Sequence, residues 1–187
     1  MTSICLVRHG ETDWNKKTKI QGWTDIPLNE TGIKQAKNCS EHLAKENWDL
    51  IISSPLKRAK QTAEIINEIL NVPLFTMEEF KERNYGDVEG MSRTERDETF
   101  PDRQYPNAEQ LTDLMERAMK GIDIIHKKYN RKKVLLIAHG GTINAILAKL
   151  SDNKIGSGIT KINNCSMTHI YHANESWHIK NYNIRTY

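Results

Sequence analysis

Short apolar runs alternate with amphipathic stripes along most of this chain. The apolar runs predict strands, because strands buried on both faces of a parallel sheet read as continuous hydrophobic segments. Six such runs lie at residues 4–7, 50–53, 72–75, 134–138, 167–171 and 177–182. We expect the run at 72–75 to form an edge strand, and the last two runs to form a closing pair around Ala173-Asn174-Glu175.

Between the strands, apolar residues recur every three or four positions and predict helices. Asn29 is expected to cap the first long helix, and Ser54 with Pro55 is expected to begin the second. The predicted apolar stripes are Ile33, Ala36, Ser40, Leu43 and Ala44; Leu56, Ala59, Ala63, Ile66 and Leu70; Leu111, Leu114, Met115, Ala118, Ile122 and Ile125; and Ile143, Ile146, Leu147 and Leu150. This alternation indicates an α/β protein, a three-layer α/β/α arrangement with a mainly parallel central sheet, in a single domain over residues 1–187.

One long stretch, residues 76–107, is polar and has little periodicity. Within it, Ser92-Arg93-Thr94-Glu95 fits a capping box and predicts a short helix. Long connections of this kind are usually functional loops. We therefore expect 76–107 to form a lid over the active site, and to open readily because it has few apolar anchors.

The composition is that of an ordinary globular protein, with 187 residues, 37% of them hydrophobic, and a net charge of +3. The three cysteines form no Cys-x-x-Cys pair, which favours a reducing, cytoplasmic location. No apolar run approaches 18 residues and no basic-then-apolar leader precedes the first strand, so we expect no membrane association. The basic run at 127–133 is interpreted as a solvated helix end rather than a nucleic-acid surface, because no aromatic stacking pattern accompanies it.

Charged side chains follow three of the predicted strands. Arg8 and His9 follow the first, Arg58 comes early in the helix after the second, and His139 follows the run at 134–138. In open α/β sheets, ligands bind at the carboxyl ends of the strands. Two guanidiniums, two imidazoles and a helix N-terminus favour a dianion, for which phosphate is the natural candidate. The sequence has no Walker loop and no carboxylate cluster suited to magnesium, so we expect neither a metal nor a cofactor.

These residue types allow phosphoryl transfer through a covalent intermediate. His9 is expected to be the nucleophile, kept neutral by the nearby arginines and oriented by a backbone carbonyl on its other ring nitrogen. Arg8, Arg58 and His139 would hold the phosphoryl oxygens as charge develops. Glu82 is the candidate proton donor to the leaving oxygen. Three further glutamates are close in sequence and stay open as alternatives: Glu78, Glu79 and Glu89.

Four segments of the chain resemble the histidine phosphatase superfamily, the phosphoglycerate mutase-like proteins, in order and spacing. They are residues 6–12, which read Leu-Val-Arg-His-Gly-Glu-Thr, and residues 53–59, 82–90 and 138–141. The resemblance implies a phosphoglycerate mutase-like fold, and it assigns the roles given above to the same residues. It also matches Asn15 and Gln21 to polar positions that contact the phosphoryl group in relatives. The backbone N–H of Gly140 is a further expected contact.

The expected function is hydrolysis of small-molecule phosphomonoesters through a phosphohistidine, by a metal-independent phosphatase of the histidine acid phosphatase type. One alternative is a phosphoglycerate mutase, which returns the phosphoryl group to bound substrate. The mutases that the chain resembles have an extra middle segment and a longer tail, and this chain has neither, which favours hydrolysis. A non-catalytic phosphate-binding module is the other alternative, and the presence of every expected catalytic residue type argues against it. The partner is expected to be a small phosphate ester; its identity and the oligomeric state are not readable from the sequence.

Overall fold

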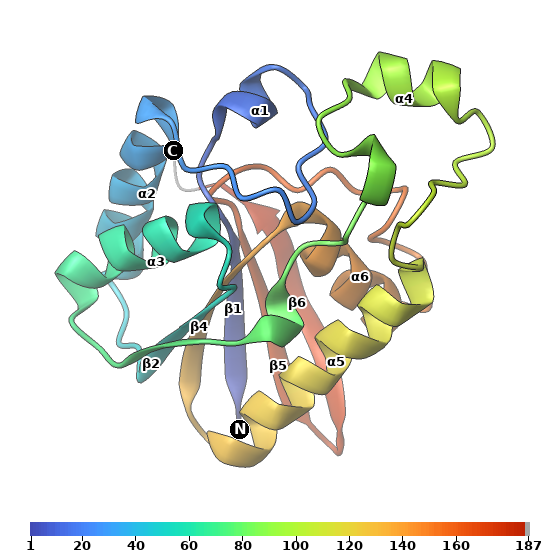
Figure 1. The fold of residues 1–187 in the computed structure, drawn as a ribbon. Coiled ribbons are helices and arrows are strands. Elements are labelled where there is room, and N and C mark those ends of the chain that lie inside the picture. The colour runs from blue at the N-terminus through green and yellow to red at the C-terminus, as the bar shows by residue number, and fades with distance from the viewer. Residues whose placement is uncertain (186–187) are drawn as a thin grey trace.

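The fold is built on one six-stranded sheet, seen in a computed structural model that describes residues 1–185 (Figure 1). The last two residues of the predicted domain, 186–187, lie outside the described part. The strand order is β3-β2-β4-β1-β5-β6. The strands are β1 (Ser3–Arg8), β2 (Leu50–Ser53), β3 (Leu74–Thr76), β4 (Lys133–Ala138), β5 (Met167–Ala173) and β6 (Ser176–Ile184). Strands β1 to β4 run parallel, and β5 and β6 close the sheet as an antiparallel pair, in agreement with the predicted mainly parallel sheet.

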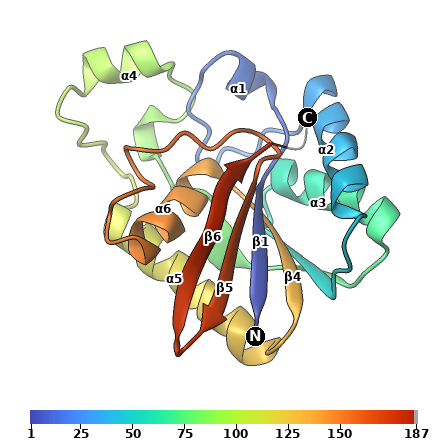
Figure 2. The same cartoon turned by 180° about the vertical axis from the view of Figure 1, so that it is seen from behind.

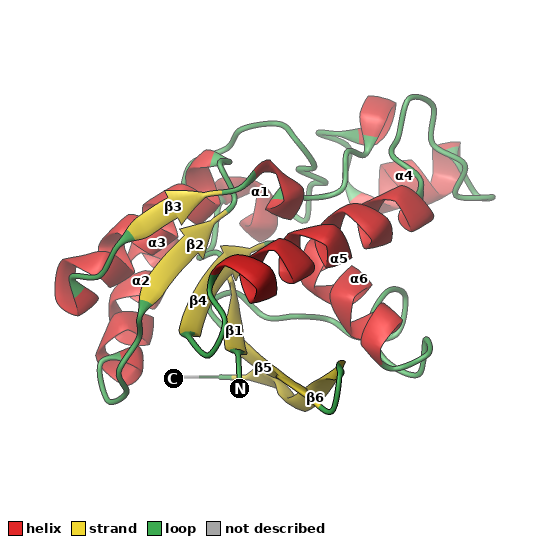
Figure 3. Cartoon of the chain, turned by 90° about the horizontal axis from the view of Figure 1, so that it is seen from below, coloured by secondary structure: helices red, strands yellow, loops and turns green. Residues whose placement is uncertain are grey.

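Helices cover both faces of this sheet, which confirms the predicted three layers (Figure 3). Helices α2 (Glu30–Leu43) and α3 (Lys57–Leu70) pack on one face, and α5 (Leu111–Lys128) and α6 (Gly140–Leu150) pack on the other. Two short helices, α1 (Asp13–Lys16) and α4 (Arg93–Thr99), and two 3₁₀ turns, η1 (Glu78–Phe80) and η2 (Gly86–Val88), lie in the connections. No helix in the described part of the chain is long and apolar enough to cross a membrane.

The central strands are buried on both faces because successive side chains point to opposite sides of the sheet. Leu6 and Leu136 belong to the core beneath α5 and α6, whereas Val7 and Ile137 belong to the core beneath α2 and α3. All four side chains are fully buried. This explains why the sequence of these strands reads as a continuous apolar run rather than an alternating one.

The carboxyl ends of three parallel strands meet at one edge of the sheet. Arg8 at the end of β1 pairs in register with Ala138 at the end of β4, and Ser53 at the end of β2 pairs with Ile137. This edge lies at the top of Figure 1, beneath α1 and α4, and the view from behind in Figure 2 shows the same relation. The residues that follow each strand are therefore brought together, as the sequence predicts.

Several boundaries and faces differ from the predictions. The helix expected to begin at Ser54 and Pro55 begins at Lys57, and its N-cap residue Leu56 makes no side-chain capping bond. The edge strand begins two residues later than expected. The buried face of α2 includes Gly32 and Cys39, which the prediction left out. Ile33 and Ala44, which were predicted to be on that face, are exposed. The N-cap of α2 is correctly predicted, since the Asn29 side chain accepts a hydrogen bond from the N–H of Gly32.

The stretch predicted as a lid divides into two parts. Residues 76–91 contain β3's last residue and the turns η1 and η2, and the side chains of Phe80 and Val88 are fully buried. Phe80 packs so close to α5 that a Cβ on Gly121 would lie 2.7 Å from its ring. The outer part, 92–107, contains α4 and no buried residue. The predicted capping box of Ser92 and Glu95 is confirmed by both of its hydrogen bonds.

Two isoleucines on α3 test the packing of this layer. Ile66 is fully buried, whereas Ile69 on the same helix is 51% exposed. We expect Ile66→Ala to lower the free energy of unfolding by about 2–5 kcal/mol, because it removes buried methyl groups and leaves a cavity. Ile69→Ala is the matched control and should change it by less than about 1 kcal/mol. Denaturant unfolding measures both, and equal losses would show that the helix face is wrongly assigned.

Candidate active site

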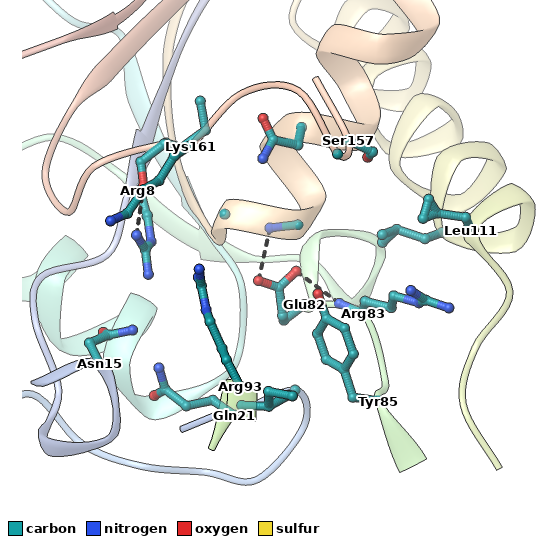
Figure 4. Close-up of a pocket in the computed structure, with 18 of the residues that line it drawn as sticks. Arg8, Asn15, Gln21, Glu82, Arg83, Tyr85, Arg93, Leu111, Ser157 and Lys161 are labelled. Atoms are coloured by element: carbon teal, nitrogen blue, oxygen red, sulfur yellow. Dashed lines mark hydrogen bonds between the residues drawn. The ribbon is translucent and has the colours of Figure 1, made fainter. Parts of the chain in front are cut away.

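The sheet edge described above forms the floor of a cavity of about 740 Å³ (Figure 4). Seven of the eight site residues predicted from the sequence line it: Arg8, His9, Asn15, Gln21, Arg58, Glu82 and Gly140. The eighth, His139, is fully buried just behind the wall, with its ring centroid 5.2 Å from that of His9. The structure therefore brings all eight predicted residues to one place.

The His9 ring is held in one orientation by its own neighbour. Its Nδ1 lies 2.7 Å from the carbonyl oxygen of Gly10, and a carbonyl can only accept a hydrogen bond, so Nδ1 carries the proton. The lone pair is then on Nε2. Burial and the charges of Arg58 and Arg8 lower the pKa of His9 well below its usual range, so the imidazole is neutral. This confirms the predicted backbone carbonyl and neutral ring.

His139 is oriented by a residue that sequence reasoning assigned to a helix cap. The hydroxyl of Ser54 lies 2.7 Å from Nε2 of His139 and accepts a hydrogen bond from the N–H of Leu56. If the Ser54 hydroxyl donates its proton to Nε2, the N–H of the neutral ring is on Nδ1, which has no hydrogen-bond partner among the described residues. Burial, together with the charges of Arg58, His9 and Arg8, lowers the pKa of His139 well below its usual range.

The buried Arg58 and the partly buried Arg8 are both held by backbone carbonyl oxygens. Arg58 donates to the carbonyls of Gly22 at 2.7 Å and Thr24 at 3.1 Å, and Arg8 donates to the carbonyl of Ile162 at 2.7 Å. Burial lowers the pKa of Arg58 to about 10 and also lowers that of Arg8. The Nε atoms of both arginines and Nδ1 of His139 are buried without a hydrogen-bond partner among residues 1–185. Three unpaired buried donors in one place favour an anionic ligand.

Glu82 lies on the opposite wall of the cavity, at the N-terminus of α6. Its carboxylate accepts hydrogen bonds from the backbone N–H groups of Gly141 and Thr142, each at 3.0 Å, and from the N–H of Arg83 at 2.9 Å. The contact needs glycine, because a Cβ on Gly141 would lie 2.4 Å from the Glu82 carboxylate. Behind Glu82, the Arg117 side chain of α5 donates a hydrogen bond to the Glu82 carbonyl and forms an ion pair with Glu109. Glu82 is thus a rigid part of the wall.

The three residues with the weaker sequence signals lie on the cavity wall as well. Asn15 lines the cavity, and its side chain also forms a capping box with Thr12. Gln21 is buried and accepts a hydrogen bond from the Thr12 hydroxyl at 2.8 Å. Gly140 lies beside the Arg8 guanidinium: a Cβ built on Gly140 would lie 3.5 Å from Nε of Arg8.

Glu89 does not line the cavity, but it holds the loop that holds Arg58. Its carboxylate accepts hydrogen bonds from the N–H groups of Trp23, Thr24 and Tyr85 and from the Thr24 hydroxyl. The carbonyl oxygens of Gly22 and Thr24, the residues before and after Trp23, then face Arg58. The Trp23 indole N–H donates to the Glu82 carbonyl at 2.7 Å. Sequence reasoning considered Glu89 only as an alternative acid. The structure places it in a supporting position instead.

Within the described residues, no group of three or more histidine, cysteine, aspartate or glutamate side chains is arranged to hold a metal ion. The charged groups that act on His9 are the guanidiniums of Arg58 and Arg8, which suit an anion. The Histidine phosphatase superfamily (branch 1) matches residues 4–185 of the sequence. The chain belongs to the histidine phosphatase superfamily.

Named relatives of this phosphatase agree with the family. An uncharacterized phosphatase, PhoE of Bacillus subtilis, is 50% identical over 187 residues, which cover 100% of this chain and 97% of PhoE. A metal-independent phosphoserine phosphatase of Arabidopsis thaliana is 34% identical over 95% of this chain and 79% of its own. The solved structure of Bacillus stearothermophilus YhfR superposes with a TM-score of 0.91 at 26% identity, covering 98% of each chain. Phosphoglycerate mutases are also among the relatives, at lower identity than PhoE and over less of this chain.

The supporting role of Glu89 predicts a loss of phosphate affinity when its charge is removed. In Glu89→Gln the amide NH₂ cannot accept, so some of the four donors around it lose their partner and the loop that holds Arg58 shifts. We expect kcat/KM to fall about tenfold, with weaker inhibition by inorganic phosphate. Asp87→Asn, an exposed carboxylate two residues away, is the control and should change neither value. Unchanged phosphate inhibition in Glu89→Gln would contradict the assignment.

The two buried histidines predict how stability depends on pH. Their pKa values are lowered in the folded protein, so the unfolded chain binds more protons below its ordinary histidine pKa of about 6.5. The contribution of these two histidines to the free energy of unfolding is therefore fully present above pH 6.5. It falls as the pH is lowered from there towards the pKa values of the folded protein. Denaturant unfolding between pH 7.5 and 5 measures this, and His139→Gln should reduce the slope. A flat wild-type profile across that range would be the contrary result.

Proposed function

We propose that this phosphatase hydrolyses small phosphomonoesters through a phosphohistidine at His9, without a metal ion. The observation that carries the proposal is the His9 tautomer. Its Nδ1 proton is bound to the Gly10 carbonyl, so the nucleophilic lone pair is on Nε2, in a cavity lined by Arg8 and Arg58. The metal-independent phosphoserine phosphatase of Arabidopsis supports the same chemistry by similarity.

In the first step, Nε2 of His9 attacks phosphorus and the bond from phosphorus to the ester oxygen breaks. Arg8, Arg58 and the Nδ1–H of His139 bind the equatorial oxygens, where charge redistributes in the transition state. These donors are already fixed before the reaction, so little reorganisation is needed. Glu82, in its acid form in the enzyme–substrate complex, gives its proton to the leaving oxygen, which departs as an alcohol.

In the second step, water attacks the phosphohistidine. Glu82, now a carboxylate, takes a proton from this water, and the bond between nitrogen and phosphorus breaks. Inorganic phosphate leaves, and His9 returns to its neutral form. The side chains of Asn15 and Gln21 and the N–H of Gly140 are proposed as further contacts to the phosphoryl group, since all three residues line the cavity.

The proposed partner is a small phosphate ester rather than a nucleic acid or a membrane. The cavity of about 740 Å³ accommodates a small molecule, and lysine and arginine side chains line it together with Glu82. We also propose a cytoplasmic location, because Cys5, Cys39 and Cys165 are free thiols buried in the fold, as suits a reducing compartment.

The covalent step is tested by trapping the intermediate. Wild-type enzyme mixed with ³²P-labelled substrate in EDTA and quenched should carry label that is stable in base and lost in acid, as expected of phosphohistidine. His9→Ala should lose both the label and p-nitrophenyl phosphate hydrolysis. His42→Ala, which changes a histidine on α2, is the control and should keep both. Full turnover by His9→Ala, or wild-type activity abolished by EDTA, would reject the mechanism.

A further inference from the structure

The main chain that carries Glu82 is fastened to the body of the protein by one side chain of α5. Arg117 donates hydrogen bonds to three carbonyl oxygens, those of Glu79 at 2.8 Å, Lys81 at 3.0 Å and Glu82 at 3.3 Å. Its two remaining N–H groups bind the two carboxylate oxygens of Glu109, each at 2.9 Å. All five N–H groups of the guanidinium therefore have an acceptor, and most of these acceptors belong to the main chain that leads to Glu82.

Glu109, the ion-pair partner of Arg117, extends this support past Glu82. Its carboxylate accepts a hydrogen bond from the backbone N–H of Asn84 at 3.2 Å, and its own backbone N–H donates to the Asn84 carbonyl at 2.9 Å. The Glu109 carbonyl also accepts a hydrogen bond from the Arg83 side chain. Arg117 and Glu109 thus hold the chain on both sides of the residue whose carboxyl group lines the cavity.

Arg117 can reach these carbonyls because α5 lies very close to the turn η1 (Figure 1). One helical turn after Arg117, α5 carries Gly121, where a Cβ would lie 2.7 Å from the Phe80 ring and 2.9 Å from Cβ of Glu79. The Phe80 side chain is fully buried against this part of the helix. Packing therefore brings irregular main chain to α5, and the guanidinium supplies the donors that its buried carbonyls need.

The consequence concerns where the Glu82 carboxyl group lies. A proton donor must be within hydrogen-bond reach of the leaving oxygen, and an error of about 1 Å in such a position can cost roughly a hundredfold in rate. The Glu82 carboxylate is bound by the N–H groups of Gly141 and Thr142, and its main-chain carbonyl is bound by Arg117 and by the Trp23 indole. Both ends of the residue are therefore fixed.

We propose that Arg117 is a positioning residue for proton donation by Glu82. Arg117 does not line the cavity, so it acts on the reaction through the main chain of Glu82 and not through the substrate. The inference rests on the proposed function, because it takes Glu82 to be the acid. Arg117 should then matter most for substrates whose leaving oxygen needs a proton.

Arg117→Lys tests this, because lysine keeps the charge but has fewer N–H donors and no planar fork. With ethyl phosphate, whose leaving oxygen is strongly basic, we expect kcat/KM to fall by about tenfold or more. With p-nitrophenyl phosphate, whose leaving group is stable as an anion, we expect a change of less than about threefold. Inhibition by inorganic phosphate, which reports on Arg8 and Arg58, should change by less than about twofold.

Glu82→Gln, which removes the proton donor itself, is the reference. In that background, Arg117→Lys should change turnover of ethyl phosphate by less than about twofold further, since two residues that act through one group are not additive. Lys120→Gln removes an exposed cation from the same helix and is the matched control. It should leave the turnover of both substrates unchanged.

Equal losses for the two substrates in Arg117→Lys would overturn the proposal, because Arg117 would then support the site as a whole. Full activity of Arg117→Lys, or full additivity with Glu82→Gln, would overturn it as well. If Arg117→Lys fails to fold, Arg117→Gln combined with Glu109→Gln leaves no buried charge alone and is judged by the same difference between substrates. If Glu82→Gln itself slows both substrates equally, Glu82 is not the proton donor, and that step of the proposed function is rejected together with this proposal.

Discussion

The active site depends on positive charge that the fold buries without pairing it to carboxylates. Arg58 and Arg8 are held by carbonyl oxygens, which satisfy their N–H groups but leave the charge in place. A carboxylate at the same positions would hold the arginines equally well, but it would compete with a phosphoryl group for them. Burial and the charges of Arg58 and Arg8 also keep His9 neutral, since protonating its ring would add another charge to the same buried volume. Anion binding and nucleophilicity therefore have one electrostatic cause.

Carboxylates support the site without forming an ion pair with either arginine in the described part of the chain, although the charge of Glu82 acts on both guanidiniums. Glu89 binds backbone N–H groups of the loop whose carbonyls face Arg58, so it positions the guanidinium through the peptide units, and its charge also acts on Arg58 directly. Glu82 is bound to the amides at the N-terminus of α6, which keep it on the wall facing His9. Ser54 plays the corresponding part for His139. Each group that would touch substrate is thus oriented by a neutral or backbone partner.

The sequence could predict the residues that chemistry places at strand ends, because the order of apolar runs determines which ends meet. Arg8, His9 and His139 follow directly from that rule. The roles of Glu89 and Ser54 could not be read in the same way, because each depends on a contact across more than 60 positions in the chain. The local pattern Ser54-Pro55 predicts a helix N-cap at Ser54, but the helix begins at Lys57 and the Ser54 hydroxyl contacts the His139 imidazole instead.

The segment predicted as a lid, residues 76–107, shows the limit of reading a polar segment as a uniform loop. Its inner part is anchored, because Phe80 and Val88 are buried in the body of the protein, whereas no residue between 92 and 107 is buried. The outer part therefore brings charge to the cavity through Arg93 and Arg103, with little apolar surface to exclude water. A mutase must keep water from its phosphohistidine while the substrate turns over in the site. Little apolar surface over the site leaves water access to the proposed phosphohistidine at His9, and this favours hydrolysis over return of the phosphoryl group to the substrate.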